Sequence, residues 1–85
     1  MIVKVQLFAK LREQLGKDRV SVEIESTQAN VSMIVEQLAI TFGQDWQREL
    51  NAPNVLCAIN RQVVERDAGL AQGDELAFFP PVTGG

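Results

Sequence analysis

Alternating apolar and polar positions predict strands near both ends of the chain and one near residue 20. In segment 2–8, Val3, Val5 and Leu7 share one face, so Phe8 falls on the opposite face with polar neighbours. Segment 20–25 alternates in the same way, and three shorter strand-like runs follow at 55–59, 62–64 and 75–79. These segments predict one mixed sheet of four to five strands.

Helical spacing predicts one main helix. Its apolar residues recur three and four positions apart: Val31, Ile34, Val35, Leu38 and Phe42. Asn30 is suited to cap the first turn, and Gly43 ends the run. One such helix covers one face of a single sheet, so we expect an α+β domain over 1–79 whose other sheet face is open.

The remaining segments are less regular. A short helix is predicted over 9–15, ending at Gly16, and a further helical turn around Trp46, which would cover the main helix. Segments 26–29 and 66–72 are predicted to be connections. Asn60 and Arg61 suit a tight turn between two strands.

Composition removes several classes of function. The net charge is −3, which argues against a protein that binds nucleic acid through its phosphates. The sequence has no histidine and one cysteine, Cys57, which excludes zinc enzymes, Ser-His-Asp hydrolases and Cys-His proteases. We therefore expect no metal site, and an inert buried thiol at Cys57 within an apolar strand.

Location is also constrained by the sequence. No apolar run approaches the roughly 20 residues that span a bilayer. The first predicted strand begins at Ile2, which leaves no room for a secretory signal peptide before it. We expect a cytoplasmic protein that does not enter the membrane.

The C-terminal segment 80–85 has the composition of an extended tail: Pro80, Pro81, Val82, Thr83, Gly84 and Gly85. The prolines end the last strand and favour an extended chain, which could project roughly 20 Å. Glycine has no Cβ, so Gly84 and Gly85 could enter a narrow channel and present an unhindered terminal carboxylate.

Three stretches of the chain resemble a known family. The strongest is Gly-Asp-Glu-Leu-Ala-Phe-Phe-Pro-Pro-Val-Thr-Gly-Gly at 73–85, supported by the Phe-Ala-x-x-Arg-Glu pattern at 8–13 and by Ala-Ile-Asn at 58–60. Together they resemble the sulfur-carrier small subunits of molybdopterin synthase. The resemblance spans the chain, although 26–54 matches only as a pattern.

That resemblance implies a ubiquitin-like β-grasp fold and a chain that carries sulfur without being an enzyme itself. It implies that Gly85 is adenylated by a ubiquitin-activator-like adenylyltransferase, which uses the ATP, so this chain would bind no cofactor. A sulfur donor enzyme would then convert Gly85 to a thiocarboxylate. The tail, from Pro80 through Gly84, would reach into the large synthase subunit, where the sulfur passes to cyclic pyranopterin phosphate. Two small and two large subunits would form a heterotetramer.

Phe8 and Phe79 are the candidate docking residues outside the tail. Both share strand faces with polar neighbours, away from the predicted core. The first and last strands are neighbours in a β-grasp fold, so the two rings could form one apolar patch for a partner. Arg12, one helical turn beyond Phe8, could pair with an acidic group there; a solvated helix charge is the alternative.

Three other functions remain open from the sequence. A related carrier could serve thiamine synthesis or tRNA thiolation, because a shared fold does not fix the recipient. A ubiquitin-like modifier would use the same terminal glycines to join target lysines. A plain β-grasp interaction module would bind its partner equally well without Gly84 and Gly85.

Overall fold

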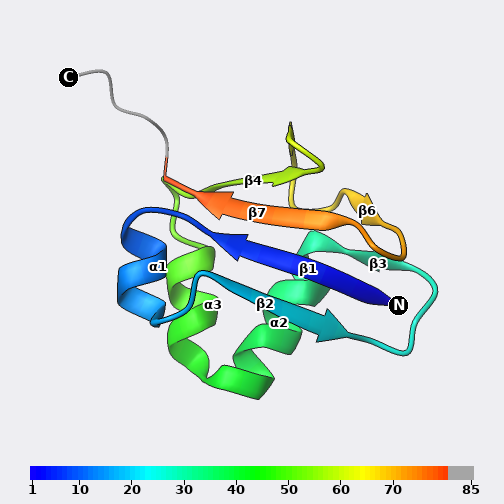
Figure 1. Ribbon diagram of the computed structural model, residues 1–85, viewed down its shortest axis with the longest axis horizontal. Helices are drawn as coiled ribbons and strands as arrows, with labels where there is room; N and C mark the ends of the chain where they lie inside the picture. The colour runs from blue at the N-terminus through cyan, green and yellow to red at the C-terminus, as the bar shows by residue number, and fades with distance from the viewer. Residues whose placement is uncertain (81–85) are drawn as a thin grey trace.

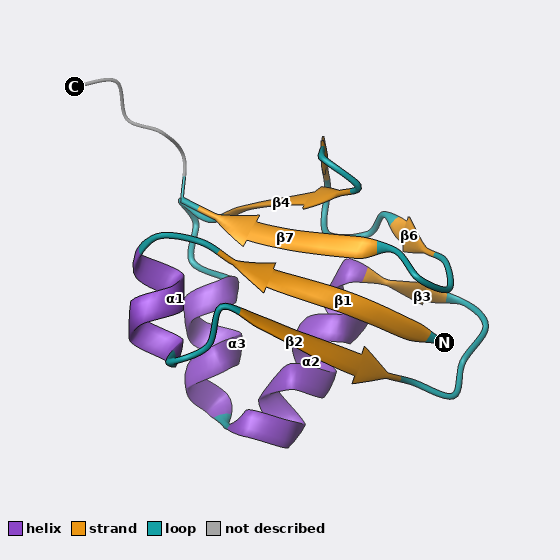
Figure 2. Ribbon diagram, viewed as in Figure 1, coloured by secondary structure: helices purple, strands orange, loops and turns teal. Residues whose placement is uncertain are grey.

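The computed structural model describes residues 1–80, which form a mixed five-stranded sheet with three helices on one face (Figures 1 and 2). In chain order the elements are β1 (Ile2–Leu7), α1 (Lys10–Leu15), β2 (Arg19–Glu23), β3 (Ala29–Asn30), α2 (Val31–Phe42), α3 (Gln44–Leu50), β4 (Leu56–Ile59), β5 (Gln62–Val64), β6 (Gly69–Leu70) and β7 (Glu75–Phe79). The strand order in the main sheet is β2-β1-β7-β4-β5. The predicted α+β fold is confirmed.

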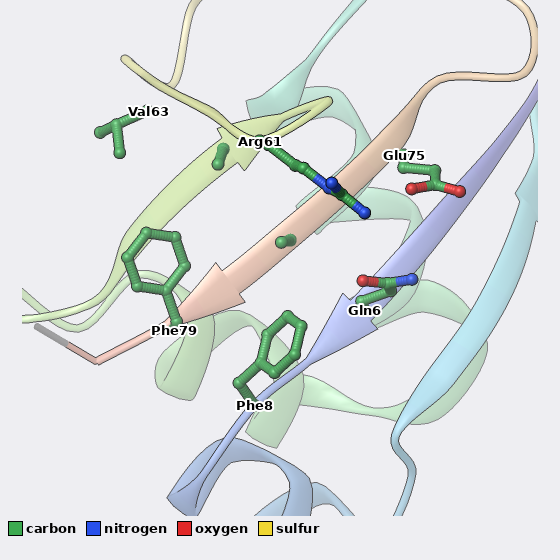
Figure 3. Close-up of a pocket in the computed structure, with 8 residues that line it drawn as sticks. Gln6, Phe8, Arg61, Val63, Glu75 and Phe79 are labelled. Atoms are coloured by element: carbon green, nitrogen blue, oxygen red, sulfur yellow. The ribbon is translucent and has the colours of Figure 1, made fainter. Parts of the chain in front are cut away.

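The first and last strands lie side by side at the centre of the sheet. β1 and β7 are parallel, with Leu7 opposite Phe78, whereas the other pairs in this sheet are antiparallel. Both strands alternate as predicted: Val3, Val5 and Phe78 are completely buried. The intervening side chains of these two strands face away from the helices, so the predicted open sheet face is also confirmed (Figure 3).

The main helix begins and ends where the sequence predicts. The Asn30 side-chain oxygen accepts a hydrogen bond of 2.9 Å from the Met33 backbone N–H, and the helix ends before Gly43. The turn around Trp46 is the separate helix α3, and Trp46 is buried in the core. Phe42 is 40% exposed rather than fully in the core, because its ring stacks on the outside of Trp46 at a centroid distance of 4.7 Å.

Two predicted connections contain a strand pairing that the sequence analysis missed. Ala29 and Asn30 of β3 pair antiparallel with Leu70 and Gly69 of β6, forming a second, two-stranded sheet. Segments 26–29 and 66–72 are therefore not wholly irregular. Two residues are too few to show an alternation, so such a pairing leaves no periodic signal. None of the helices in residues 1–80 is long and apolar enough to cross a membrane.

Candidate docking face and tail

Phe8 and Phe79 lie together on the open face of the sheet. Phe8 follows β1 and its backbone N–H donates a hydrogen bond of 3.2 Å to the Phe78 carbonyl, which brings it beside the end of β7. The Phe8 side chain is 46% exposed and Phe79 is partly buried, whereas Phe78 is completely buried on the helix side. The structure thus places the two rings as predicted; their role in binding stays a prediction.

A hollow of about 410 Å³ opens between these rings and the β4–β5 hairpin (Figure 3). We call it the docking hollow, and its lining residues are Gln6, Phe8, Ala58, Arg61, Val63, Glu75, Ala77 and Phe79. Ala58 and Ala77 are opposite each other in the β4–β7 register, so two methyl groups form the floor where larger side chains would fill the space. Phe8, Phe79 and Val63 surround this floor with apolar surface, and Val63 is 63% exposed.

Basic residues lie beside the apolar part of this face, on the side of β2 and α1. Arg12 lines a smaller depression of about 110 Å³ together with Phe8, Asp18 and Arg19. The predicted docking residue Arg12 is therefore beside Phe8, and its guanidinium has no ion pair among residues 1–80. Lys4 lines the next depression along the sheet, again with Arg19.

The predicted tail begins at the edge of the docking hollow. Pro80 follows Phe79 directly and is partly buried, next to Lys10 and Leu11 of α1 in a depression that also contains Val55. The remaining predicted tail residues, Pro81, Val82, Thr83, Gly84 and Gly85, lie outside the described residues. The roles assigned to them stay predictions.

Cys57 is placed as predicted, in the core. Its side chain is 2% exposed, and its S–H donates to the Val64 carbonyl at 3.3 Å. Burial raises the pKa of the Cys57 thiol above its ordinary value of 9.0; Arg66 lowers it in part and Glu65 adds to the increase. A buried protonated thiol is a poor nucleophile, so Cys57 is unsuited to relay sulfur.

The sequence and structural comparisons agree on one family. The family model described as the ThiS family matches residues 5–85 of the chain. This chain belongs to the ThiS family. It is 37% identical over 84 residues to the molybdopterin synthase sulfur carrier subunit of Haemophilus influenzae, an alignment that covers 99% of this chain and all of that protein.

Solved structures of ThiS-like proteins have the same fold. The putative molybdopterin converting factor subunit 1 from Pyrococcus furiosus superposes with a TM-score of 0.80 at 28% identity, covering 96% of this chain and 99% of that one. SAMP1 from Haloferax volcanii gives a TM-score of 0.79 at 28% identity, with both chains fully covered. A complex of subunits 1 and 2 of the molybdopterin-converting factor from Helicobacter pylori gives a TM-score of 0.61 at 20% identity over both full chains, which concerns the fold alone.

Sequence reasoning missed one wall of the docking hollow in this ThiS-family domain. It assigned no face to Val63 and no role to Arg61, Ala58 or Ala77. A signal was present for Val63: the two-residue turn at Asn60 and Arg61 fixes the β4–β5 register and sets Val63 opposite Ala58. The β4–β7 register that pairs the two alanines has no such local marker.

Proposed function

We propose that this chain is the sulfur carrier of a molybdopterin synthase and that Gly85 holds the sulfur as a thiocarboxylate. One observation carries the proposal: the likeness to the Haemophilus influenzae molybdopterin synthase sulfur carrier subunit extends over essentially the whole of both chains at 37% identity. The ThiS-family match continues to Gly85, so it includes the terminal Gly-Gly on which the chemistry depends.

The proposed chemistry needs only an accessible carboxylate from this chain. The Gly85 carboxylate attacks the α-phosphorus of ATP on an activating enzyme, pyrophosphate leaves, and a glycyl adenylate forms. A sulfide-equivalent nucleophile from a donor enzyme then attacks the carbonyl carbon, and AMP leaves with the bonding electron pair. The product is a thiocarboxylate, whose sulfur is anionic and nucleophilic at neutral pH. That sulfur then attacks a carbon of the pterin precursor, and an oxygen substituent of that carbon leaves with the bonding electron pair. Water finally cleaves the acyl C–S bond and restores the carboxylate.

In this proposal the chain is not itself an enzyme. A carrier needs no general base, which is compatible with a sequence that contains no histidine. ATP would bind to the activating enzyme, and acid–base groups for both steps would come from the partners. The docking hollow is the surface by which those partners would hold the domain while the tail enters their active sites.

We assign the docking hollow to the large synthase subunit, in an assembly of two small and two large subunits. The Helicobacter pylori complex of subunits 1 and 2 supports a partner of this kind for a protein with this fold. The activating enzyme would use the same face at another time. Native mass spectrometry of all three proteins should therefore detect each binary complex, and a ternary complex through a single carrier would contradict a shared face.

Intact-mass spectrometry tests the proposed function directly. The protein is incubated with the activating enzyme, ATP and a sulfide source, and a thiocarboxylate adds about 16 Da to the carboxylate form. The control is the chain without Gly85, which we expect to stay unchanged in mass. Sulfur loading of that control, or no loading of the full chain, would overturn the proposal.

Protein modification is a second candidate, favoured by the likeness to SAMP1. Another solved structure of that Haloferax volcanii protein is described as small archaeal modifier protein 1 and gives a TM-score of 0.76 at 27% identity, covering 95% of this chain and 98% of that one. A modifier would form isopeptide bonds from Gly85 to target lysines. Peptide mapping for such adducts on cellular proteins distinguishes the two functions, because sulfur transfer leaves no covalent adduct.

A further inference from the structure

Arg61 occupies a turn that is fixed rigidly to the central sheet. The Asn60 side-chain oxygen accepts a hydrogen bond of 3.0 Å from the Glu75 N–H, and its amide nitrogen donates to an Asp74 carboxylate oxygen at 3.0 Å. The Asn60 backbone N–H also donates to the Glu75 carbonyl at 2.8 Å. These three bonds hold the hairpin against the start of β7, so the Cα of Arg61 has a defined position above the docking hollow.

The turn itself does not account for an arginine. Asn60 and Arg61 have φ angles of 50° and 73°, the signs of a type I′ turn. Asparagine tolerates this conformation, and the second position of such a turn strongly favours glycine, because a side chain with a Cβ is strained there. An arginine at this position therefore requires a reason outside the backbone.

The Arg61 side chain extends over the docking hollow. Figure 3 shows it extending over β7 towards Gln6 and Glu75, with the Phe8 and Phe79 rings at the opposite end of the hollow. Within residues 1–80 the guanidinium has no hydrogen-bond or ion-pair partner. Five N–H donors are thus available at the polar end of an apolar hollow.

The charge of the whole open face indicates which kind of partner surface the Arg61 donors would bind. The docking hollow and its two neighbouring depressions are lined by Lys4, Arg12, Arg19 and Arg61, against only Asp18 and Glu75. This basic face belongs to a chain whose net charge is −3. Such a distribution suits a partner with an acidic surface, since complementary potentials favour one docking orientation.

We propose that Arg61 is a specificity-determining residue that binds a carboxylate of the large synthase subunit through its planar guanidinium. An apolar side chain of the large subunit, next to that carboxylate, would fill the docking hollow between Phe8 and Phe79. The proposal rests on the proposed function for the identity of the partner. Arginine suits this task because its fork of N–H groups matches both carboxylate oxygens, which lysine cannot reproduce.

The test measures the Kd of each variant for the purified large subunit of the same organism, together with its unfolding temperature. Arg61→Gly removes the side chain but suits the positive φ, so its unfolding temperature should equal or exceed that of the wild type. We expect its affinity to fall about tenfold, and that of Arg61→Glu to fall about 30-fold or more. Arg61→Lys should recover only part of the affinity.

Arg48→Glu is the matched control for charge reversal. Arg48 lies on α3 with its side chain 72% exposed, outside the docking hollow, so its replacement should change the Kd less than about twofold. Raising the salt concentration should weaken binding of the wild type to the large subunit more than binding of Arg61→Gly, because the variant lacks the proposed ion pair.

Three outcomes separate the possible failures. Wild-type affinity in Arg61→Gly would show that Arg61 is only a turn residue, and the proposed function would stand. Equal losses in Arg61→Glu and Arg48→Glu would show that net charge alone matters, which also overturns a specific role for Arg61. A wild-type chain that does not bind the large subunit would overturn the proposed function, and the Arg61 proposal with it.

Discussion

Replacing Phe78 or Phe79 by alanine should affect two different properties of the protein, although the residues are adjacent in sequence. Phe78 is completely buried and the Arg66 guanidinium lies over its ring, 5.3 Å from the centroid. Phe78→Ala should lower the free energy of unfolding by about 3–5 kcal/mol, the usual cost of deleting a fully buried ring. A domain of this size has a total stability of only about 4–13 kcal/mol, so this variant should be severely destabilised.

Phe79→Ala should destabilise the domain far less. Its ring is only partly buried and lines the docking hollow, so its loss should cost the fold roughly 1–2 kcal/mol, clearly less than the loss of Phe78. Loss of an aromatic anchor from an interface typically costs about 2 kcal/mol or more of binding, which is about a 30-fold increase in Kd. Phe8→Ala should resemble Phe79→Ala, because its ring is 46% exposed at the same hollow.

Urea unfolding and affinity for the large subunit are measured on the same preparations. Trp46 is the single tryptophan and only 4% exposed, so its fluorescence reports global unfolding without a label. Equal loss of stability in Phe79→Ala and Phe78→Ala would refute the assignment of the two rings to opposite faces. Unchanged affinity in both Phe79→Ala and Phe8→Ala would refute the docking role while leaving the face assignment intact.

Three further predictions concern the tail, the core thiol and the strained backbone. Deleting Gly85 should abolish sulfur loading in the mass assay and leave the urea midpoint unchanged, and a shifted midpoint would show that the tail contributes to the fold. Burial raises the pKa of the Cys57 thiol, so the native state holds this proton more tightly than the unfolded state. The stability advantage of the wild type over Cys57→Ala should therefore be complete below pH 9.0 and should decline as the pH rises further. Urea titrations at matched ionic strength measure this difference. Ala9 has φ 54° and ψ −129°, so Ala9→Gly should raise the free energy of unfolding by about 1 kcal/mol. A clearly lower free energy of unfolding in this variant would show that the local backbone strain is negligible.

The central part of this fold could be predicted because the signals are local and periodic. The alternation in β1 and β7 predicted which residues face the helices, and it also predicted that Phe8 and Phe79 lie on the open face. The cap at Asn30 marked the start of α2 because its side chain satisfies a backbone donor of the first turn, a bond made within three residues.

The docking hollow could be predicted only in part because it depends on pairings between distant segments. Its alanine floor exists only because Ala58 and Ala77, nineteen positions apart, are opposite each other across β4 and β7. The β3–β6 pairing joins Ala29 to Leu70 and is too short to leave a pattern in the sequence. Composition and periodicity describe each strand separately, whereas the register between strands is set by the whole fold.

The backbone strain in this domain is concentrated around the docking hollow. Among residues 1–80, the non-glycine residues with positive φ are Ala9, Asn60 and Arg61. Ala9 follows Phe8 directly, and the other two form the turn that carries Arg61 over the hollow. Such conformations persist only where the surrounding structure determines them, and the Asn60 hydrogen bonds to Asp74 and Glu75 do so for the hairpin turn. The helix side thus supplies stability, while the open side carries partly exposed aromatic rings and an arginine that is unpaired among residues 1–80, features that the proposed binding of a partner to this face would explain.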